Sequence, residues 1–303
     1  MKKSTKKAWV RWAQILFWIV MFAGAVLVTL VPPPRHKPPE VATVRVEQPS
    51  YNDNVAPETP PHAPSHLPAP SLPHIKNGET LIAIVIDDMG LDIRDSRRAI
   101  NLPPYITLSF LPYATRLKEQ TREARDNGHE LMLHMPMEPV GRADPGPGAL
   151  LTELPIDEIR ERFQIALASF VGFDGVNNNM GSKFTASQKD MEPVMEELKE
   201  RDLFFLDSRT SSKSIGDALA REKGVPSIAR DVFLDDDMSP KAVRAQLAQL
   251  ERVAKRKGYA VAIGHPHPAT LDALETWLPD AEARGFKFVR LGQLLGNKSN
   301  LAD

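Results

Sequence analysis

The stretch LIAIVIDDMG, residues 81–90, decides the fold of this chain. Its first six residues form a continuous apolar run, which suits a strand buried on both faces, as in a parallel sheet. The run ends in two adjacent carboxylates, Asp87 and Asp88. In parallel α/β folds the functional end is where the strands deliver their carboxyl termini, so this stretch predicts an α/β domain with its site beside these acids.

Apolar strand-like runs and amphipathic helix-like segments alternate from here to about residue 295. After the first strand, we expect strands at 105–110, 130–134, near 175–176, 203–207, 227–234, 259–263 and 287–290. We expect helices at 93–102, 116–127, 156–170, 191–201, 215–223, 240–257 and 269–284. This alternation predicts either a distorted or incomplete (β/α) barrel or a wide doubly wound sheet.

Composition narrows the possible functions. The chain has 303 residues, a formal net charge of −1 and no cysteine. Disulfides, thiolate zinc sites and cysteine nucleophiles are therefore excluded. The near-neutral charge gives no indication of a nucleic-acid partner. No sequence feature indicates the oligomeric state.

The N-terminal segment predicts a membrane anchor. Five basic residues precede an uncharged, mostly apolar run of 20 residues, Trp12 to Val31. A helix of that length crosses a hydrocarbon core of about 30 Å. Because basic flanks stay in the cytoplasm, the rest of the chain should lie in the periplasm or outside the cell, attached to the inner membrane by one pass. A cleaved signal peptide is the main alternative.

A proline-rich stretch separates the anchor from the domain. Residues 32–73 hold 13 of the 27 prolines and few large apolar residues. Such a segment buries too little surface to offset its ordering entropy, which predicts a disordered tether. The expected organisation is an anchor at 1–31, a tether at 32–78, an α/β domain at 79–297 and a tail at 298–303.

Polar residues cluster at the carboxyl ends of the predicted strands, and this clustering predicts a functional site. They are Asp87, Asp88, His134, Asn177 to Asn179, Asp207, Ser208, Asp235 to Asp237, His265 and His267. Two adjacent acids repel each other unless one binds a cation while the other keeps or takes a proton. That division gives one metal ligand and one general base, although a helix N-cap is an alternative reading.

Histidines supply the other expected groups. His134 closes an apolar strand and is a good ligand for zinc or a similar divalent ion, and Glu138 lies four residues on, within reach of the same ion. His265 and His267 flank a proline after a late strand, where an imidazole can protonate a leaving group. We interpret Asn178, Asn179, Asp207, Arg209 and His267 as supporting or substrate-binding residues. Asp235 to Asp237 are interpreted as a solvated turn.

The order of these motifs resembles the polysaccharide deacetylases of the NodB-like carbohydrate esterase type, and in detail their divergent, YibQ-like branch. The matching segments span about residues 80–295 and read IDDMG (86–90), LHMPME (133–138), MGSKFT (180–185), LDSRT (206–210), DVFLD (231–235) and IGHP (263–266).

The resemblance implies a distorted (β/α) barrel and a metal-dependent removal of acetyl groups from a cell-envelope polysaccharide. By position, Asp87 is similar to the base that activates water, Asp88 and His134 to metal ligands, and His265 to the general acid. The implied cofactor is a divalent metal, with zinc preferred.

Two positions depart from the family pattern. Typical members carry a second histidine where this chain has Glu138, and many divergent members carry a histidine where it has Asn179. A glycan-binding or scaffold protein without hydrolysis is therefore the second hypothesis. A hydrolase of another class, such as a phosphoesterase or an amidase, is the third.

Overall fold

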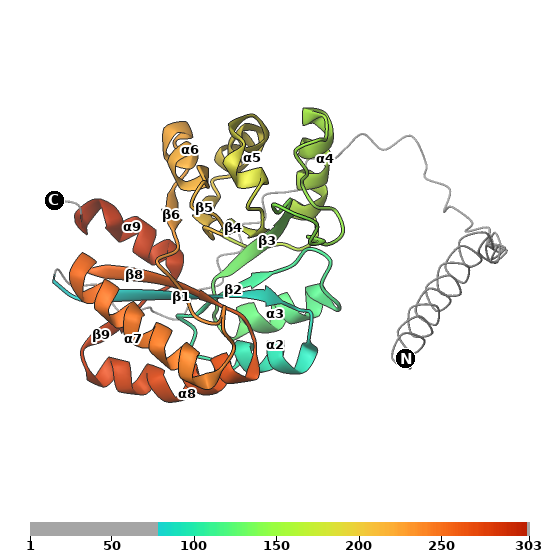
Figure 1. The fold of residues 1–303 in the computed structure, drawn as a ribbon. Helices are drawn as coiled ribbons and strands as arrows, with labels where there is room; N and C mark the ends of the chain where they lie inside the picture. Colours follow the sequence, from blue (N-terminus) through green and yellow to red (C-terminus); the bar gives the residue numbers. More distant parts are fainter. Residues whose placement is uncertain (1–77, 302–303) are drawn as a thin grey trace, which may run out of the picture. The chain divides into compact units, whose positions relative to one another are not determined.

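The computed structural model describes residues 78–301 (Figure 1). The predicted anchor and nearly all of the predicted tether lie outside the described residues. Within residues 78–301, no helix combines the length and the apolar character that a bilayer span requires.

A single parallel sheet of nine strands forms the centre of the domain. Eight strands lie in the order β6-β5-β4-β3-β2-β1-β8-β7, and β9 pairs with the first part of β1. The strands are β1 (Thr80–Met89), β2 (Thr107–Phe110), β3 (Leu131–Met137), β4 (Gly175–Met180), β5 (Phe204–Asp207), β6 (Ser227–Ala229), β7 (Val232–Phe233), β8 (Tyr259–Gly264) and β9 (Phe286–Phe288).

The sheet is curled, and its two edge strands are consecutive in sequence. The expected single strand at 227–234 is in fact two short strands, β6 and β7, which pair at opposite edges of the sheet. Only Arg230 and Asp231 join them, so Ala229 and Val232 lie within about 11 Å, three Cα steps of 3.8 Å. The doubly wound alternative is wrong, because an open sheet would keep its edges far apart.

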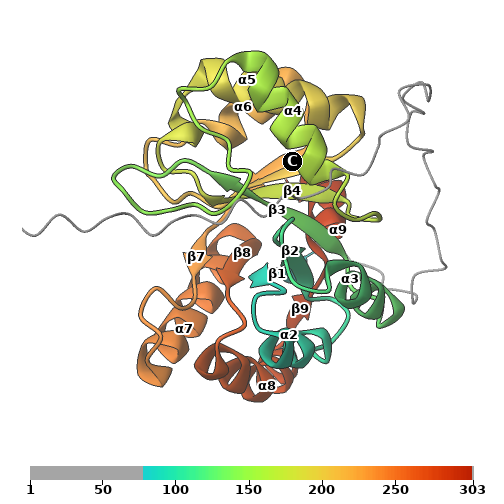
Figure 2. The same ribbon diagram turned by 90° about the vertical axis from the view of Figure 1, so that its right-hand side faces the viewer.

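Helices cover the outer face of the sheet (Figure 2). They are α2 (Ile93–Ile100), α3 (Leu117–Asp126), α4 (Ile156–Leu167), α5 (Gln188–Glu200), α6 (Gly216–Lys223), α7 (Pro240–Lys257) and α8 (Pro268–Ala283). A further helix, α9 (Leu291–Leu301), was not expected and runs across the predicted domain boundary at 297.

Strand alternation divides the apolar residues between two cores. Along β1, Ile82, Ile84 and Ile86 belong to the large core that also holds the buried residues of helices α2 to α8. Leu81, Ala83 and Val85 point the other way, into the hollow of the curled sheet, where they share a second core with residues of α9. Successive residues of a strand face opposite sides, so this division fixes which side chains beyond Val85 point inward.

Helix α9 closes the end of the hollow at the start of the strands. Leu291 and Leu294 belong to the inner core, and the backbone N–H of Gly292 donates to both oxygens of Glu130, at 3.1 and 2.9 Å. Thr107 Oγ1 also donates to Glu130. Burial, together with Asp174 nearby, raises the pKa of the Glu130 carboxyl from its ordinary value of 4.5 to about 7.

This carboxyl should make folding pH-dependent. Between about pH 4.5 and 7 the folded chain keeps a proton that the unfolded chain releases, so the free energy of unfolding should fall by about 3 kcal/mol as pH rises through this window. Glu130→Gln should remove that component, measured by urea denaturation at several pH values. The exposed Glu200→Gln variant is the control, and an unchanged slope in Glu130→Gln would refute this role.

Candidate functional site

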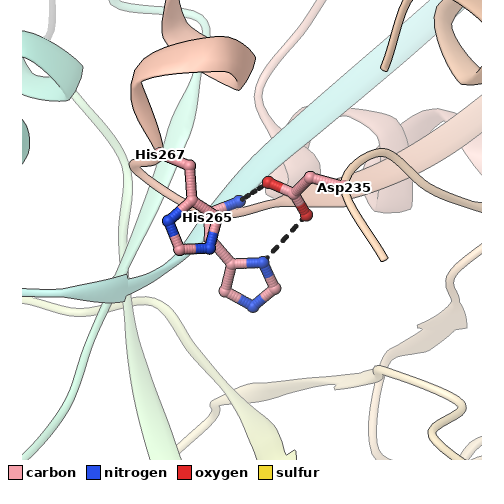
Figure 3. A group of neighbouring side chains, drawn as sticks. All are labelled: Asp235, His265 and His267. Atoms are coloured by element: carbon pink, nitrogen blue, oxygen red, sulfur yellow. Dashed lines mark hydrogen bonds and ion pairs between the residues drawn. The ribbon is translucent and has the colours of Figure 1, made fainter. Parts of the chain in front are cut away.

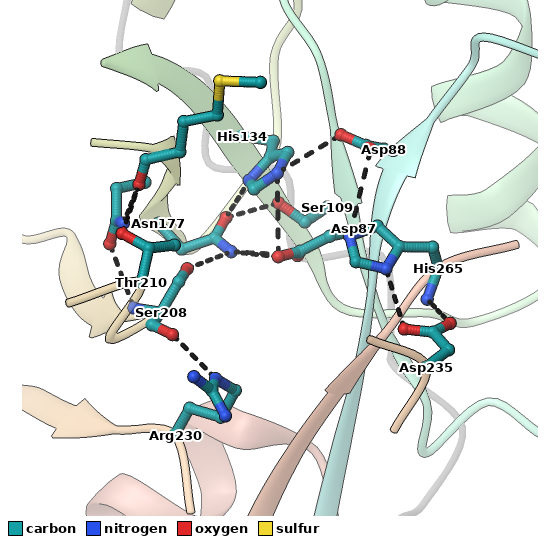
Figure 4. Close-up of polar contacts among 12 residues, drawn as sticks. Asp87, Asp88, Ser109, His134, Asn177, Ser208, Thr210, Arg230, Asp235 and His265 are labelled. Atoms are coloured by element: carbon teal, nitrogen blue, oxygen red, sulfur yellow. Dashed lines mark hydrogen bonds and ion pairs between the residues drawn. The ribbon is translucent and has the colours of Figure 1, made fainter. Parts of the chain in front are cut away.

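Five polar side chains continue the inward-facing rows of the strands at the other end of the hollow (Figure 4). On β1, Asp87 follows Val85 by two residues, and on β3, His134 follows Met132 in the same way. The others come from β2, β4 and the residue after β8, namely Ser109, Asn177 and His265. Alternation thus brings into one site residues that are distant in sequence.

A bulge lets the neighbouring acid face the same site. In a regular strand Asp87 and Asp88 would point to opposite faces of the sheet. The pairing of β1 with β2 shifts register between Ile86 and Met89, and Asp88 adopts a left-handed backbone with φ of 53°. This conformation is unfavourable for a residue other than glycine, and such strain is concentrated at functional sites. The bulge re-aims the Asp88 carboxylate toward His134.

Asn177 is the hydrogen-bond centre of the site. Its Nδ2 donates to both oxygens of Asp87, each at 2.9 Å, and to Ser208 Oγ at 3.2 Å. Its Oδ1 accepts from Ser109 Oγ at 2.6 Å and from His134 Nδ1 at 3.0 Å. Asn177, Asp87 and His134 are at most 2% exposed, so these bonds form away from water.

His134 presents its other nitrogen to both acids. Nε2 lies 3.4 Å from Asp88 Oδ1 and 3.6 Å from Asp87 Oδ2. Two ligands of one tetrahedral zinc ion, each bonded at 2.0–2.2 Å, lie about 3.4 Å apart. Burial acts to lower the pKa of His134, but the charges of Asp87 and Asp88 prevail and raise it, so without a cation these acids favour a proton on Nε2. In the neutral ring the proton on Nδ1 is used toward Asn177, which leaves the Nε2 lone pair facing the carboxylates. This set of donors therefore fits a divalent cation held by Asp88 and His134.

The electrostatics separate the roles of the two acids. Burial raises the pKa of Asp87, although His134, His265 and Asn177 oppose the rise. Burial also acts to raise the pKa of Asp88, but the hydrogen bond and charge of His134 prevail and lower it. Asp88 therefore stays ionised, as a ligand must, and Asp87 is the more basic carboxylate.

A second acid orients His265. Asp235 Oδ1 accepts from His265 Nδ1 at 2.9 Å, and Oδ2 accepts from the His265 backbone N–H and from Thr270 Oγ1, both at 2.7 Å. This leaves His265 Nε2 facing the site, 3.9 Å from Asp88 Oδ2. The interpretation of Asp235 as part of a solvated turn was wrong, because the residue is 4% exposed and saturated with donors.

Asp235, His265 and His267 also form a possible metal-binding group, since one ligand atom from each lies within 4.8 Å of the others (Figure 3). Asp235 already accepts three hydrogen bonds, so it is less available as a metal ligand. An ion bound through His265 Nδ1 would have to displace the proton on that nitrogen. His267 itself is partly exposed and is the N-cap residue of helix α8, with its ring 5.6 Å from that of His265.

Glu138 has other partners than the predicted metal site. Lys183 Nζ donates to its Oε1 at 2.6 Å, and the N–H and Oγ1 of Thr152 donate to its Oε2, both at 2.7 Å. Within residues 78–301, no hydrogen bond or ion pair joins it to Asp88 or His134. Glu138 thus ties the loop after β3 to the segment after β4, and its role as a ligand rests on the sequence alone.

The other supporting residues lie around the site. Asn178 accepts from the backbone N–H of Ser208 and donates to Met180 O, so it joins β4 to the loop after β5. Asn179 is half-buried, and its Cα pairs in register with that of Pro136. Asp207 accepts from the N–H groups of Arg209 and Asp217, which fixes the approach to α6. Arg209 is exposed.

Sequence reasoning left out Ser109 and Arg230 and did not single out Asn177 among the three asparagines. The Arg230 guanidinium donates to the carbonyls of Ser208 and Arg209 and lies 4.8 Å from the centre of the Phe233 ring. Burial lowers the pKa of the Arg230 guanidinium, although the negative charges of Asp87 and Asp207 oppose the fall. Period-two counting along β2 and β4 was the signal for Ser109 and Asn177. The predicted end of the strand at 105–110 was correct, but the strand near 175–176 was placed too short to reach Asn177.

Comparisons with known proteins identify the family. A family model described as divergent polysaccharide deacetylase matches residues 84–295. An uncharacterized protein of Haemophilus influenzae is 34% identical over 220 residues, covering 73% of this chain and 78% of the relative. The uncharacterized protein YibQ of Escherichia coli is 36% identical over 194 residues, covering 64% of this chain and 61% of YibQ.

A solved structure shares the fold. The crystal structure of an uncharacterized protein from Agrobacterium tumefaciens has a TM-score of 0.71 at 33% identity, with 73% of this chain and 92% of that chain covered. This chain belongs to the divergent polysaccharide deacetylase family, and the resemblance inferred from its motifs is confirmed.

The Asp235 contact should control the protonation of His265. Burial lowers the pKa of His265, but the bond and charge of Asp235 outweigh it and raise the pKa to about 9. Asp235→Asn should therefore move the His265 titration to lower pH, measured by NMR of the ring protons, because the neutral amide no longer stabilises the imidazolium. The exposed neighbour Asp236→Asn is the control, and an equal pKa in all three proteins would refute the coupling.

Proposed function

We propose that this protein is a metal-dependent deacetylase that hydrolyses acetyl groups from a cell-envelope polysaccharide. One observation carries the proposal: His134 Nε2 lies 3.4 Å from Asp88, the spacing of two ligands of one ion, with Asp87 at 3.6 Å. Family membership supplies the substrate class, and the geometry supports a hydrolytic site.

Asp88 and His134 would hold the divalent ion, with zinc preferred because imidazole and carboxylate both suit it. Such an ion, when bound, polarises an acetyl carbonyl and acidifies water. Asp87, buried and fixed by Asn177, accepts the proton of the attacking water, and its raised pKa makes it a stronger base than a solvated aspartate.

His265 is placed to donate a proton to the departing amine or alcohol. With its pKa near 9 it is an imidazolium at neutral pH, and Asp235 fixes the ring so that Nε2 faces the site. Asp87 and His265 therefore reach the site in opposite protonation states, which general acid–base catalysis requires.

A glycan-binding protein without hydrolysis is the second candidate. It is favoured by the partners of Glu138, since that carboxylate is engaged by Lys183 and Thr152. Among the described residues, Asp88 and His134 then remain as the two expected ligands of the ion. A weakly held ion would leave recognition intact while hydrolysis is lost.

A set of variants tests the proposal. The purified wild-type protein should hold about one divalent ion and release acetate from acetylated glycans. Asp88→Ala and His134→Ala should lose the ion, because each removes a ligand. Asp87→Asn should keep the ion and lose activity by roughly 10²-fold or more, as expected for removal of a general base. Metal analysis and an acetate-release assay measure these outcomes.

Glu138→Ala is the matched control, because it removes a carboxylate close in sequence to His134. The proposal expects it to retain the ion. Loss of the ion in Glu138→Ala alone would transfer the ligand role to Glu138. An ion-bearing wild-type protein that binds glycan and releases no acetate would support the binding function instead.

The sequence of residues 1–31 supports a further part of the proposal, that one inner-membrane helix holds the domain in the periplasm or outside the cell. The full-length protein should stay with the membrane after alkaline carbonate extraction, and a protease added to spheroplasts should digest the domain. A chain released by carbonate, or protected from the protease, would contradict this placement.

A further inference from the structure

The Asn177 side chain is bound on both of its polar atoms within the buried site. Its Nδ2 lies 2.9 Å from each oxygen of Asp87, and its Oδ1 lies 3.0 Å from His134 Nδ1 and 2.6 Å from Ser109 Oγ. The residue has no exposed surface. One planar amide therefore bridges the expected base and an expected metal ligand.

The orientation of this amide follows from its partners. An ionised carboxylate only accepts hydrogen bonds, so the group facing Asp87 must be the NH₂. The carbonyl oxygen must then face His134, and only a proton on Nδ1 completes that contact. Of the two neutral tautomers of His134, the amide selects the one whose Nε2 lone pair faces Asp87 and Asp88.

The same amide also fixes the distance between the two groups. Asp87 is held symmetrically through both oxygens, and Ser208 Oγ accepts a further bond from the same nitrogen. The 3.6 Å between Asp87 Oδ2 and His134 Nε2 is thus maintained by a rigid, uncharged group rather than by a direct hydrogen bond. A charged bridge would have added a repulsive or competing charge at this position.

We propose that Asn177 is a positioning residue that holds His134 in its Nδ1-protonated tautomer, ready to bind a cation, and holds Asp87 beside it. This inference rests on the proposed function, because it assigns how the same site is assembled. The observation behind it is the bonding of Asn177, which is independent of any measured activity.

The tautomer of His134 provides a direct test. The full-length protein, labelled with ¹⁵N in histidine, is examined at alkaline pH, where the ring is neutral, and the two ring nitrogens are distinguished by their chemical shifts. His134 should show the Nδ1-protonated form in the wild type. Asn177→Leu, which fills the volume with no polar atom, should give a mixture of tautomers and bind Zn²⁺ about 10- to 100-fold more weakly.

Two further variants make the test specific. Ser109→Ala removes the other donor to the same oxygen and should leave the tautomer of His134 unchanged. Asn177→Asp keeps an acceptor toward His134 but loses the donor toward Asp87, so it should keep the tautomer while acetate release falls. A spectrum of each variant like that of the wild type elsewhere in the chain verifies folding.

The inference is overturned if Asn177→Leu keeps the wild-type tautomer and a Zn²⁺ affinity within twofold of the wild type. It is also overturned if Ser109→Ala or Asn177→Asp disturbs the tautomer as much as Asn177→Leu does. Failure of the proposed function gives a different result: a wild-type protein that releases no acetate still reports the tautomer of His134. The two ideas can therefore fail separately.

Discussion

The site depends on one backbone constraint: two adjacent carboxylates must face the same side of a sheet. Strand alternation forbids this, and the bulge at Asp88, with its left-handed backbone, is what overcomes it. Residues in such strained conformations persist only when their surroundings over-determine them. Here the surroundings are the β2 and β8 ladders on either side of β1 and the imidazole of His134.

The buried charges of the site are balanced by pairing and by one neutral bridge. Asp88 lies between the rings of His134 and His265. Asp235 balances the charge of His265 through the other ring nitrogen, Nδ1. Asp87 is hydrogen-bonded by the Asn177 amide and has His134 Nε2 at 3.6 Å, and burial outweighs both contacts and raises its pKa. Burying a carboxylate is costly unless donors satisfy it, so the neutral bridge makes a basic aspartate compatible with a folded core.

The curl of the sheet brings these groups together, and the side chains of His265 and Asp88 remain 17% and 33% exposed. At the start of the strands, α9 and the inner apolar core close the hollow. At the carboxyl ends, the two-residue link between β6 and β7 carries Arg230, which binds the carbonyls of the loop after β5. Glu138 joins the loop after β3 to the segment after β4 through Thr152 and Lys183. The polar residues at the carboxyl ends of the strands thus include some that join loops as well as those with a proposed catalytic or ligand role.

The sequence by itself determined the class of fold, the family and most of the candidate chemistry. Continuous apolar runs and helical segments of period 3.6 are local signals, so the strands and helices from β1 to α8 were largely predictable. The placement of Asp87, Asp88, His134 and His265 near strand ends was predictable for the same reason. The motif order around them identified the family.

Only the tertiary structure decided which of these groups meet. Glu138 was expected at the ion, but its partner Lys183 lies 45 residues on, and no local pattern records that contact. Asp235 was interpreted as a turn, whereas β7 and β8 place it behind His265. Asn177 became the central residue because the β3–β4 register sets it opposite His134. Side-chain pairing across strands depends on register and curvature, which arise from the packing of the whole sheet.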